Sequence, residues 1–200
     1  NRHAGLSQII IDLKRDGANV RPIKNMAGGE DFNEVVFEDV VVPKDRIVGE
    51  SGNGWAQVTS ELAYERSGPE RFLSAFRVFV ELVRFCGPDP TNYQATVIGR
   101  IASHIMTLRR MSISVAGMLE SGKDVVVEAA LVKELGNNFE KLLPELARAV
   151  GSDGFSDFSH ESDLFRRTFE DTMLLSPSFT LRGGTREILR GVIARGLGLR

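Results

Sequence analysis

The spacing of apolar residues after position 54 is the feature that most constrains the fold of this chain. These residues recur at three- and four-residue intervals, as on one face of an α-helix, over about 72–83, 98–119, 131–146 and 185–197. Gly, Pro and Ser residues separate the segments. Ser121-Gly122 ends the second one, and Pro144 is expected to kink the third. Amphipathic helices joined by such connections predict a mainly α protein with an antiparallel four-helix bundle.

The first 50 residues have a different pattern. Short clusters rich in Val and Ile lie at 9–11, 20–23, 35–37 and 40–42, with turn formers such as Gly28-Gly29 between them. Such clusters predict about three strands, too few to close a sandwich or barrel of the usual size. We therefore expect a partial β-sheet over 1–50, completed by residues outside this chain, and the helical bundle over 51–200. The chain begins as if cut from a longer protein.

Composition narrows the classes of function. The chain is 42% hydrophobic and carries 25 basic and 27 acidic residues, which is ordinary for a soluble domain and gives no reason to expect nucleic-acid binding. No apolar run is long enough to cross a membrane. The lone cysteine, Cys86, cannot form a disulfide within the chain, which favours a cytoplasmic location.

Metal and hydrolase chemistry find no support in the motifs. His3, His104 and His160 are isolated, and none stands at a ligand-like spacing from another histidine or from the cysteine, so no metal site is predicted. The chain also has no Gly-x-Ser-x-Gly motif, which argues against a serine hydrolase.

Two motifs have both a chemical and a structural interpretation. Gly183-Gly184-Thr185 opens a helix, where free amides and the helix dipole favour an anionic group, but the threonine can equally be a simple helix cap. Glu65 lies in a helix just before Pro69, where a carboxylate can act as a general base, but such residues more often pair with a neighbouring Arg. The residues alone leave both alternatives open.

Three segments together resemble the acyl-CoA dehydrogenase family. The stretch 33–43 (Asn-Glu-Val-Val-Phe-Glu-Asp-Val-Val-Val-Pro), followed by Gly-Asn-Gly-Trp at 52–55, resembles the exit of that family's middle domain. The stretch 151–155 (Gly-Ser-Asp-Gly-Phe) resembles its Gly-Gly-x-Gly-Phe turn, with Ser152 replacing the second Gly. The stretch 183–190 (Gly-Gly-Thr-Arg-Glu-Ile-Leu-Arg) resembles the signature of its last helix. The three matches follow family order and span nearly the whole chain.

The resemblance implies a fold of helical N-terminal domain, β-barrel-like middle domain and C-terminal four-helix bundle, usually assembled as a pair of dimers. It implies FAD as the cofactor and an acyl-CoA thioester as the substrate. A carboxylate would remove the proton α to the thioester while a hydride moves from the β-carbon to the flavin. An electron-transferring flavoprotein is the expected electron acceptor, and the expected assembly is a homo-oligomer, dimer or tetramer, or a complex with a heteromeric partner subunit.

The resemblance also locates the base. Many family members have a glutamate directly before the terminal Gly-Thr, but this chain has Gly183 there. A second group carries the base in a Leu-x-x-Glu-Arg context on the first helix of the C-terminal domain, which 62–66 (Leu-Ala-Tyr-Glu-Arg) matches. Glu65 is therefore the predicted base and Glu70 the alternative, about 140° away around a regular helix. The expected substrate contacts are Tyr64, Arg66 and Arg182.

The flavin contacts depart from the family pattern. Family members usually carry Arg-x-x-Phe-Gly after the first bundle helix, and its Arg reaches the FAD of a neighbouring subunit. This chain instead reads Arg84-Phe85-Cys86-Gly87. The candidates for flavin binding are Thr185, Gly183, Gly184, Gly151, Gly154 and Arg84. The departure motivates an alternative, a non-catalytic or partly flavin-deficient subunit of a heteromeric acyl-CoA dehydrogenase. A helical interaction module is a third possibility, which the ordered motifs disfavour.

Overall fold

The computed structural model describes residues 3–151 and 160–199, and the side chains of these residues except 160–162. The chain divides into two compact units, Asn1–Glu61 and Leu62–Arg200. The division falls within helix α1 (Gly54–Ser67), whose last residues, from Leu62 on, belong to the second unit.

The first unit contains an antiparallel β-hairpin. Its strands β1 (Ala18–Ile23) and β2 (Phe32–Phe37) pair in register along their whole length. A single bridge joins Ile9 to Ile47, next to the 3-10 helix η1 (Lys44–Arg46). The strands expected at 20–23 and 35–37 are thus confirmed.

The strands expected at 9–11 and 40–42 are wrong. Segment 9–11 contributes only the bridge at Ile9, and segment 40–42 belongs to no strand. The second error has a local cause. Asp39 has a φ of 52°, which turns the backbone out of the extended conformation, and Pro43 has no amide to donate to a ladder.

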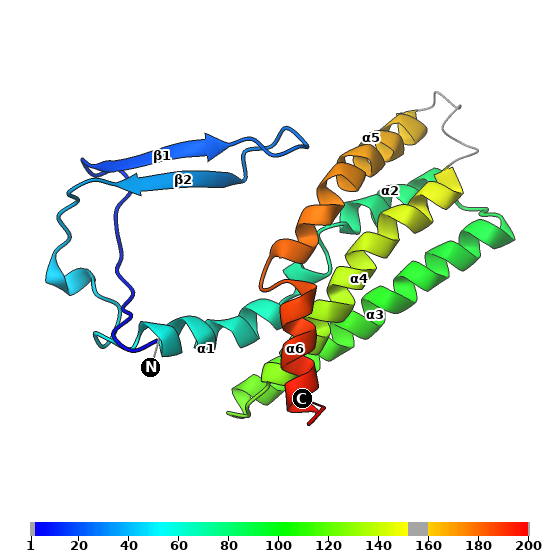
Figure 1. Cartoon of the computed structure of the whole chain (residues 1–200). Coiled ribbons are helices and arrows are strands. Elements are labelled where there is room, and N and C mark those ends of the chain that lie inside the picture. The colour runs from blue at the N-terminus through cyan, green and yellow to red at the C-terminus, as the bar shows by residue number, and fades with distance from the viewer. Residues whose placement is uncertain (1–2, 152–159, 200) are drawn as a thin grey trace. The chain divides into compact units, whose positions relative to one another are not determined.

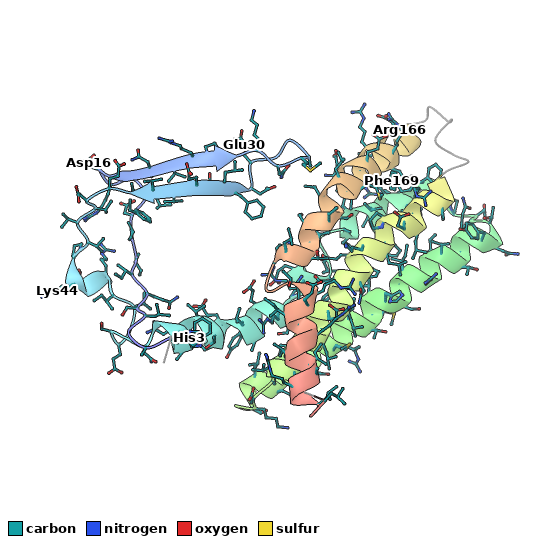
Figure 2. The ribbon with its side chains drawn as sticks, viewed as in Figure 1. His3, Asp16, Glu30, Lys44, Arg166 and Phe169 are labelled. Atoms are coloured by element: carbon teal, nitrogen blue, oxygen red, sulfur yellow. The ribbon has the colours of Figure 1, made fainter. Side chains whose placement is uncertain are left out.

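The hairpin has no core of its own. Every residue of β2 is exposed, including Phe32 and Phe37 at 57% and 48%. Figure 2 shows the side chains standing off both faces of the two strands. Two strands with uncovered apolar faces are marginally stable in water at best. The hairpin is therefore the partial sheet that the sequence predicts.

The second unit is a helical bundle. Helices α2 (Phe76–Cys86), α3 (Asn92–Glu120), α4 (Val126–Gly151) and α5 (His160–Leu175) pack along one another, and α6 (Arg186–Gly196) lies against α4 (Figure 1). Two 3-10 helices, η2 (Pro69–Arg71) and η3 (Ser176–Leu181), lead into α2 and toward α6. The predicted fold, mainly α with a four-helix bundle after a partial sheet, is confirmed.

The helix ends follow local chemistry. Thr91 and Gln94 form a reciprocal capping box at the start of α3, and Gly122 follows its last turn with a φ of 72°. The predicted end of this helix at Ser121-Gly122 is thus confirmed. Helix α4 continues through Pro144, which is buried.

Two helix predictions need correction. The helix expected from residue 72 begins only at Phe76, because Pro69 starts η2 and Phe72 follows with a φ of −145°, which is not helical. The spacing of apolar residues in the sequence does not predict α5, and the predicted bundle has α6 as its fourth helix instead. Phe165 and Phe169 of α5 are nonetheless in the core, while Arg166 is partly exposed (Figure 2).

The core of the bundle is apolar along α2 and α3 but not along α4. Val78, Leu82 and Ile101 have no exposed surface. On α4 the buried set includes Lys133, Asn137 and Glu140, each with 0% exposure. The apolar stripe expected on this helix lies off the centre of the buried face, since Leu135 is 43% exposed. Helix α4 therefore carries a polar cluster into the core.

Candidate active site

The second unit brings the end of α1 beside the turn between η3 and α6. Gly183 and Gly184 form this turn with φ values of 66° and 104°, which favour glycine. A β-carbon at position 183 would lie 3.3 Å from Oε1 of Glu65. Among the described residues, the main-chain amides of these two glycines make no hydrogen bond. A carboxylate thus lies beside a turn whose two amides are free to bind a ligand.

Arg71 anchors Glu65. Its Nη2 donates to Glu65 Oε1 at 2.7 Å, and its Nε donates to the main-chain oxygen of Glu65 at 2.9 Å. The Arg71 side chain is 12% exposed and that of Glu65 is 37% exposed. Oε2 of Glu65 accepts no hydrogen bond from the described part of the chain. One carboxylate oxygen is therefore fixed, and the other is available to take a proton.

Glu70 is placed differently. Helix α1 ends at Ser67, so Glu70 lies in η2 and not on the same helix as Glu65. Its side chain is 57% exposed and lies 3.8 Å from Arg71 Nε. The atoms nearest to a β-carbon at position 183 belong to Glu65 and Lys133. Of the two candidate bases, Glu65 is the one that lies beside the Gly-Gly turn.

Arg66 also binds the Gly-Gly turn. It is 8% exposed, and its Nε donates to the main-chain oxygen of Gly183 at 2.9 Å. Burial lowers the pKa of the Arg66 guanidinium, although the neighbouring Glu65 charge opposes the shift. Arg66, which is buried, thus links the end of α1 to the turn at Gly183, next to Glu65.

Lys133 lies beneath the same turn. Its Cε would be 3.7 Å from a β-carbon at position 183. Its Nζ donates to Asn137 Oδ1 and, at 3.2 Å, to the main-chain oxygen of Phe179 in η3. Burial lowers the pKa of Lys133 to about 8, opposed by the charge of Glu140. The amide nitrogen of Asn137 is buried and has no partner among the described residues.

Glu140 and Arg182 continue the network. Glu140 has no exposed surface, and its Oε1 accepts from the main-chain N–H of Ser74 at 2.9 Å. Arg182 Nη2 donates to Ser74 Oγ at 2.7 Å and, more weakly, to Glu140 Oε2 at 3.5 Å. The Arg182 guanidinium also stacks over the ring of Phe179, 5.1 Å from its centroid. Arg182 is thus held in place while 35% of its side chain stays exposed.

A separate ion pair fixes α6 on α4. Arg186 donates to Glu134 through Nη2 at 2.9 Å, and Arg190 donates to it through Nε at 3.0 Å. The Glu134 side chain is only 10% exposed. Burial alone would raise the pKa of Glu134, but the hydrogen bonds from the two arginines outweigh burial and hold the pKa below its usual value.

The predicted flavin residues fall into two groups. Gly183, Gly184 and Thr185 form the turn and the start of α6, where Thr185 is the N-cap by backbone conformation but its side chain makes no capping bond. Gly151 ends α4, and Gly154 lies outside the described residues. Arg84 lies near the end of α2, paired with Glu81 at 2.9 Å and still 62% exposed.

The Gly-Gly turn and Arg84 are far apart in the bundle, as the contacts at the two ends of α5 show. Phe85, next to Arg84, stacks on Phe165 in the first turns of α5, with ring centroids 5.0 Å apart. The Gly-Gly turn comes after the other end of α5, beyond η3. Helix α5 has 16 residues, so it is about 24 Å long. Arg84 and the turn therefore lie toward opposite ends of the bundle.

Tyr64, the remaining predicted contact, is 64% exposed. It lines a groove of about 310 Å³ between the end of α1 and α3, together with Ser67, Pro69 and Ser112. The described residues contain no group of three His, Cys, Asp or Glu side chains that could hold a metal. No described helix is long and apolar enough to cross a membrane.

Sequence reasoning missed the cluster beneath the turn, which consists of Lys133, Asn137, Glu140 and Arg71. A signal for part of it existed. Lys133, Asn137 and Glu140 are spaced i, i+4 and i+7, in phase with the buried Ala129, Leu143 and Ala147. Polar residues at core positions of an amphipathic helix predict a buried polar site.

The second unit is thus a helical bundle whose last helix follows a Gly-Gly turn, with the carboxylate of Glu65 fixed beside that turn. Residues 52–198 match the family described as "Acyl-CoA dehydrogenase, C-terminal domain". This match covers more than half of the chain, and the chain belongs to the acyl-CoA dehydrogenase family.

Curated relatives agree. An acyl-CoA dehydrogenase named IpdE1 from Mycolicibacterium smegmatis is 31% identical over 99% of this chain and 50% of its own length. Its namesake from Mycobacterium tuberculosis is also 31% identical, over 99% of this chain and 52% of its own length. The chain thus spans about half the length of these relatives.

Solved structures share the fold. Butyryl-CoA dehydrogenase from Megasphaera elsdenii matches with a TM-score of 0.78 at 18% identity, over 99% of this chain and 53% of the other. A chain of the ChsE4-ChsE5 complex from Mycobacterium tuberculosis matches with a TM-score of 0.77 at 24% identity, over 100% of this chain and 54% of the other. At these identities the likeness establishes the fold alone.

Flavin binding is a property of this family, and the residues beside Glu65 fit that group. The turn at Gly183 and Gly184 has no side chains to obstruct a planar ring, and its two amides are unpartnered among the described residues. Thr185, the N-cap residue, follows the turn, and its hydroxyl interacts with the carboxylate of Glu187.

Proposed function

We propose that the protein containing this chain catalyses the FAD-dependent α,β-dehydrogenation of an acyl-CoA thioester to the trans-2-enoyl-CoA, with Glu65 as the base. The observation that carries this proposal is the position of the Glu65 carboxylate beside Gly183 in a chain of this family. The resemblance gives many members a glutamate at the position of Gly183, and in this chain the carboxylate of Glu65 lies beside that position. Base catalysis requires a carboxylate within reach of the α-carbon, whatever its origin in the chain.

The residues around Glu65 support a division of labour. When bound, FAD supplies the hydride acceptor for the β-carbon. Glu65 would take the α-proton on Oε2, while Arg71 keeps Oε1 in place. The amides of Gly183 and Gly184 would donate to the thioester carbonyl oxygen, on which negative charge develops as the proton leaves. Fixed donors of this kind lower the barrier because they need no reorientation during the reaction.

The three residues proposed to contact the substrate differ in their exposure. Tyr64 and Arg182 retain exposed surface near the ends of α1 and η3, and we assign them to the acyl-CoA. Arg66 is buried against Gly183, so its part in substrate binding is indirect, through the shape of the turn.

The two groups of flavin candidates fit two different flavins. Gly183, Gly184 and Thr185 would line the flavin at the subunit's own active site, with the two glycine amides left to donate to the thioester, while Arg84 would reach the FAD of a neighbouring subunit. This requires an oligomer, a homodimer or homotetramer in the simplest case. An electron-transferring flavoprotein is the proposed electron acceptor, and the proposed location is the cytoplasm. The half-buried thiol of Cys86, whose pKa burial raises, is suited to remain reduced there.

The test compares two glutamine variants of the full-length protein. Glu65→Gln should bind flavin normally, but its flavin should be reduced by acyl-CoA about 10²- to 10⁴-fold more slowly, as expected for loss of a general base. Glu70→Gln is the matched control, because its carboxylate is exposed and lies in η2. Bleaching of the flavin spectrum with a panel of acyl-CoA thioesters gives both rates and substrate class. Unchanged bleaching in Glu65→Gln would move the base to Glu70 or elsewhere.

The second candidate function is a subunit of a heteromeric dehydrogenase in which a partner binds flavin. It is favoured by the ion pair of Arg84 with Glu81, which occupies part of the only arginine proposed for the second flavin. Flavin content separates the two candidates. A full-length homo-oligomer that purifies with stoichiometric FAD supports the first, and flavin uptake only on co-expression with a partner supports the second.

A further inference from the structure

Lys133 stands out because burying a charged lysine opposes folding. The chain has six lysines, and the other five are exposed while Lys133 has 0% exposure. Its ammonium group has a defined place, with hydrogen bonds to Asn137 on its own helix and to Phe179 in η3. A buried ammonium group needs hydrogen-bond and charge partners to offset its desolvation, and the partners of Lys133 show which segments it holds in place.

The geometry points to the Gly-Gly turn. Lys133 holds the main-chain oxygen of Phe179, four residues before Gly183. Its Cε and Oε1 of Glu65 are both within 4 Å of the place that a β-carbon on residue 183 would occupy. Arg66 holds the same turn by the Gly183 oxygen. The 179–184 segment is thus held at two main-chain oxygens by two buried cations.

We propose that Lys133 is a positioning residue for the dehydrogenation site, whose ammonium group holds the 179–184 segment against Glu65 and loosens its hold when it becomes neutral. The proposal rests on the proposed function and deepens it by adding a pH-sensitive support to the site. Lys133 touches neither substrate nor flavin in this role. It acts through the turn that carries Gly183.

The charges around Lys133 set the pH range. Glu140 on α4 and Glu65 on α1 favour the ammonium form, while Arg182 after η3 and Arg71 in η2 oppose it. Burial is the largest influence and brings the pKa of Lys133 to about 8. The group is therefore charged at neutral pH and neutral above about pH 8. Loss of the charge also removes a counter-charge from Glu140, which has no exposed surface.

Kinetics of the full-length holoenzyme test the proposal. The wild-type kcat should fall on the alkaline side with a midpoint near pH 8, the value to which burial brings the pKa of Lys133. Lys133→Met should lower kcat by about 10- to 100-fold, as for a small misplacement of reacting groups, with little change in KM. Lys133→Arg, which stays charged, should remove the alkaline fall. Lys141→Met is the matched control, an exposed lysine on the same helix. Unchanged kcat and an unchanged alkaline limb in a folded Lys133→Met would overturn the proposal.

Hydrogen exchange of the wild-type protein provides a test that needs neither activity nor a variant. After correction for intrinsic rates, protection of amides in 179–184 should drop between pH 7 and pH 9, on either side of the Lys133 pKa of about 8. Protection in α3 should not change. If no acyl-CoA reduces the flavin, the proposed function fails while this measurement still decides on Lys133. Equal protection of 179–184 at both pH values would overturn the proposal.

Discussion

At position 183, backbone conformation and the carboxylate of Glu65 together demand glycine. Residues with a side chain rarely adopt the φ of 66° found here, and a β-carbon at this position would be 3.3 Å from Glu65 Oε1. Gly183→Ala should therefore cost about 1–2 kcal/mol of stability from the backbone and also displace the carboxylate. We expect lower unfolding free energy in urea and slower flavin reduction by acyl-CoA in the full-length protein.

Gly122→Ala separates the two effects. Gly122 has a φ of 72°, and nothing lies within 4 Å of its β-carbon position. It should show the same backbone cost as Gly183→Ala but no loss of flavin reduction. Equal rates of reduction in the two variants would mean that contact with Glu65 does not matter.

At the scale of residues, the sequence predicts best those features that depend on neighbouring positions in the chain, such as turns and helix caps. Gly183, Glu65 and the cap at Thr185 were all singled out, and the structure brings the first two together. Lys133 and Glu140 escaped notice because a charged residue on a long helix is usually solvated. Their spacing in phase with the apolar residues of α4 was the one signal available, and the tertiary contacts of α4 with η2, η3 and α6 show that this face is buried.

At the scale of elements, the placement of α6 depends on Glu134. This carboxylate binds both Arg186 and Arg190, and its pKa is held below the usual value. A carboxyl group with a lowered pKa in the folded state stabilises the fold above its unfolded pKa, and the contribution is lost as pH falls through the folded pKa. Glu134→Gln should cost about 2 kcal/mol near pH 7, measured by urea unfolding.

The pH dependence distinguishes this role from packing. The difference between Glu134→Gln and wild type should shrink as the pH is lowered below the usual glutamate range, because wild-type Glu134 then becomes protonated too. Glu145→Gln is the control on the same helix. Glu145 forms an exposed pair with Arg148, so its loss should cost well under 1 kcal/mol. A pH-independent difference for Glu134→Gln would contradict the ion-pair explanation.

The spacing of apolar residues predicts the helices that have wide apolar stripes, but it does not predict α5. Its buried face includes Thr168 and Thr172, which are 8% and 9% exposed, beside Phe165 and Phe169. Thr172 satisfies its hydroxyl by donating to the main-chain oxygen of Thr168 at 2.7 Å. Threonine counts as a polar residue when apolar spacing is used to find helices. Two of the four residues named here on the buried face of α5 are threonines, so the apolar spacing is too sparse to predict this helix.

At the scale of the whole molecule, the two units should differ in local stability. The apolar core consists of residues from Phe72 onward, while the hairpin exposes apolar side chains on both faces. Amide exchange in this 200-residue chain should therefore be fast in 18–37 and slow in α3 and α4, as measured by mass spectrometry. Comparable protection in the two units would show that the hairpin is stabilised by contacts absent from its own unit.

Flavin binding also depends on the whole molecule, because the candidate flavin-binding residues do not form one site within this chain. The Gly-Gly turn and Arg84 lie toward opposite ends of α5, which is about 24 Å long, and Arg84 is paired with Glu81. A flavin at the turn would meet two free amides and Thr185, contacts too few to offset the entropy of binding. The 200-residue chain should therefore retain no stoichiometric FAD after gel filtration, whereas the full-length oligomer should retain it. Tight, stoichiometric FAD on the 200-residue chain would show that one subunit's bundle suffices, and Arg84→Ala would then reveal whether that residue contributes.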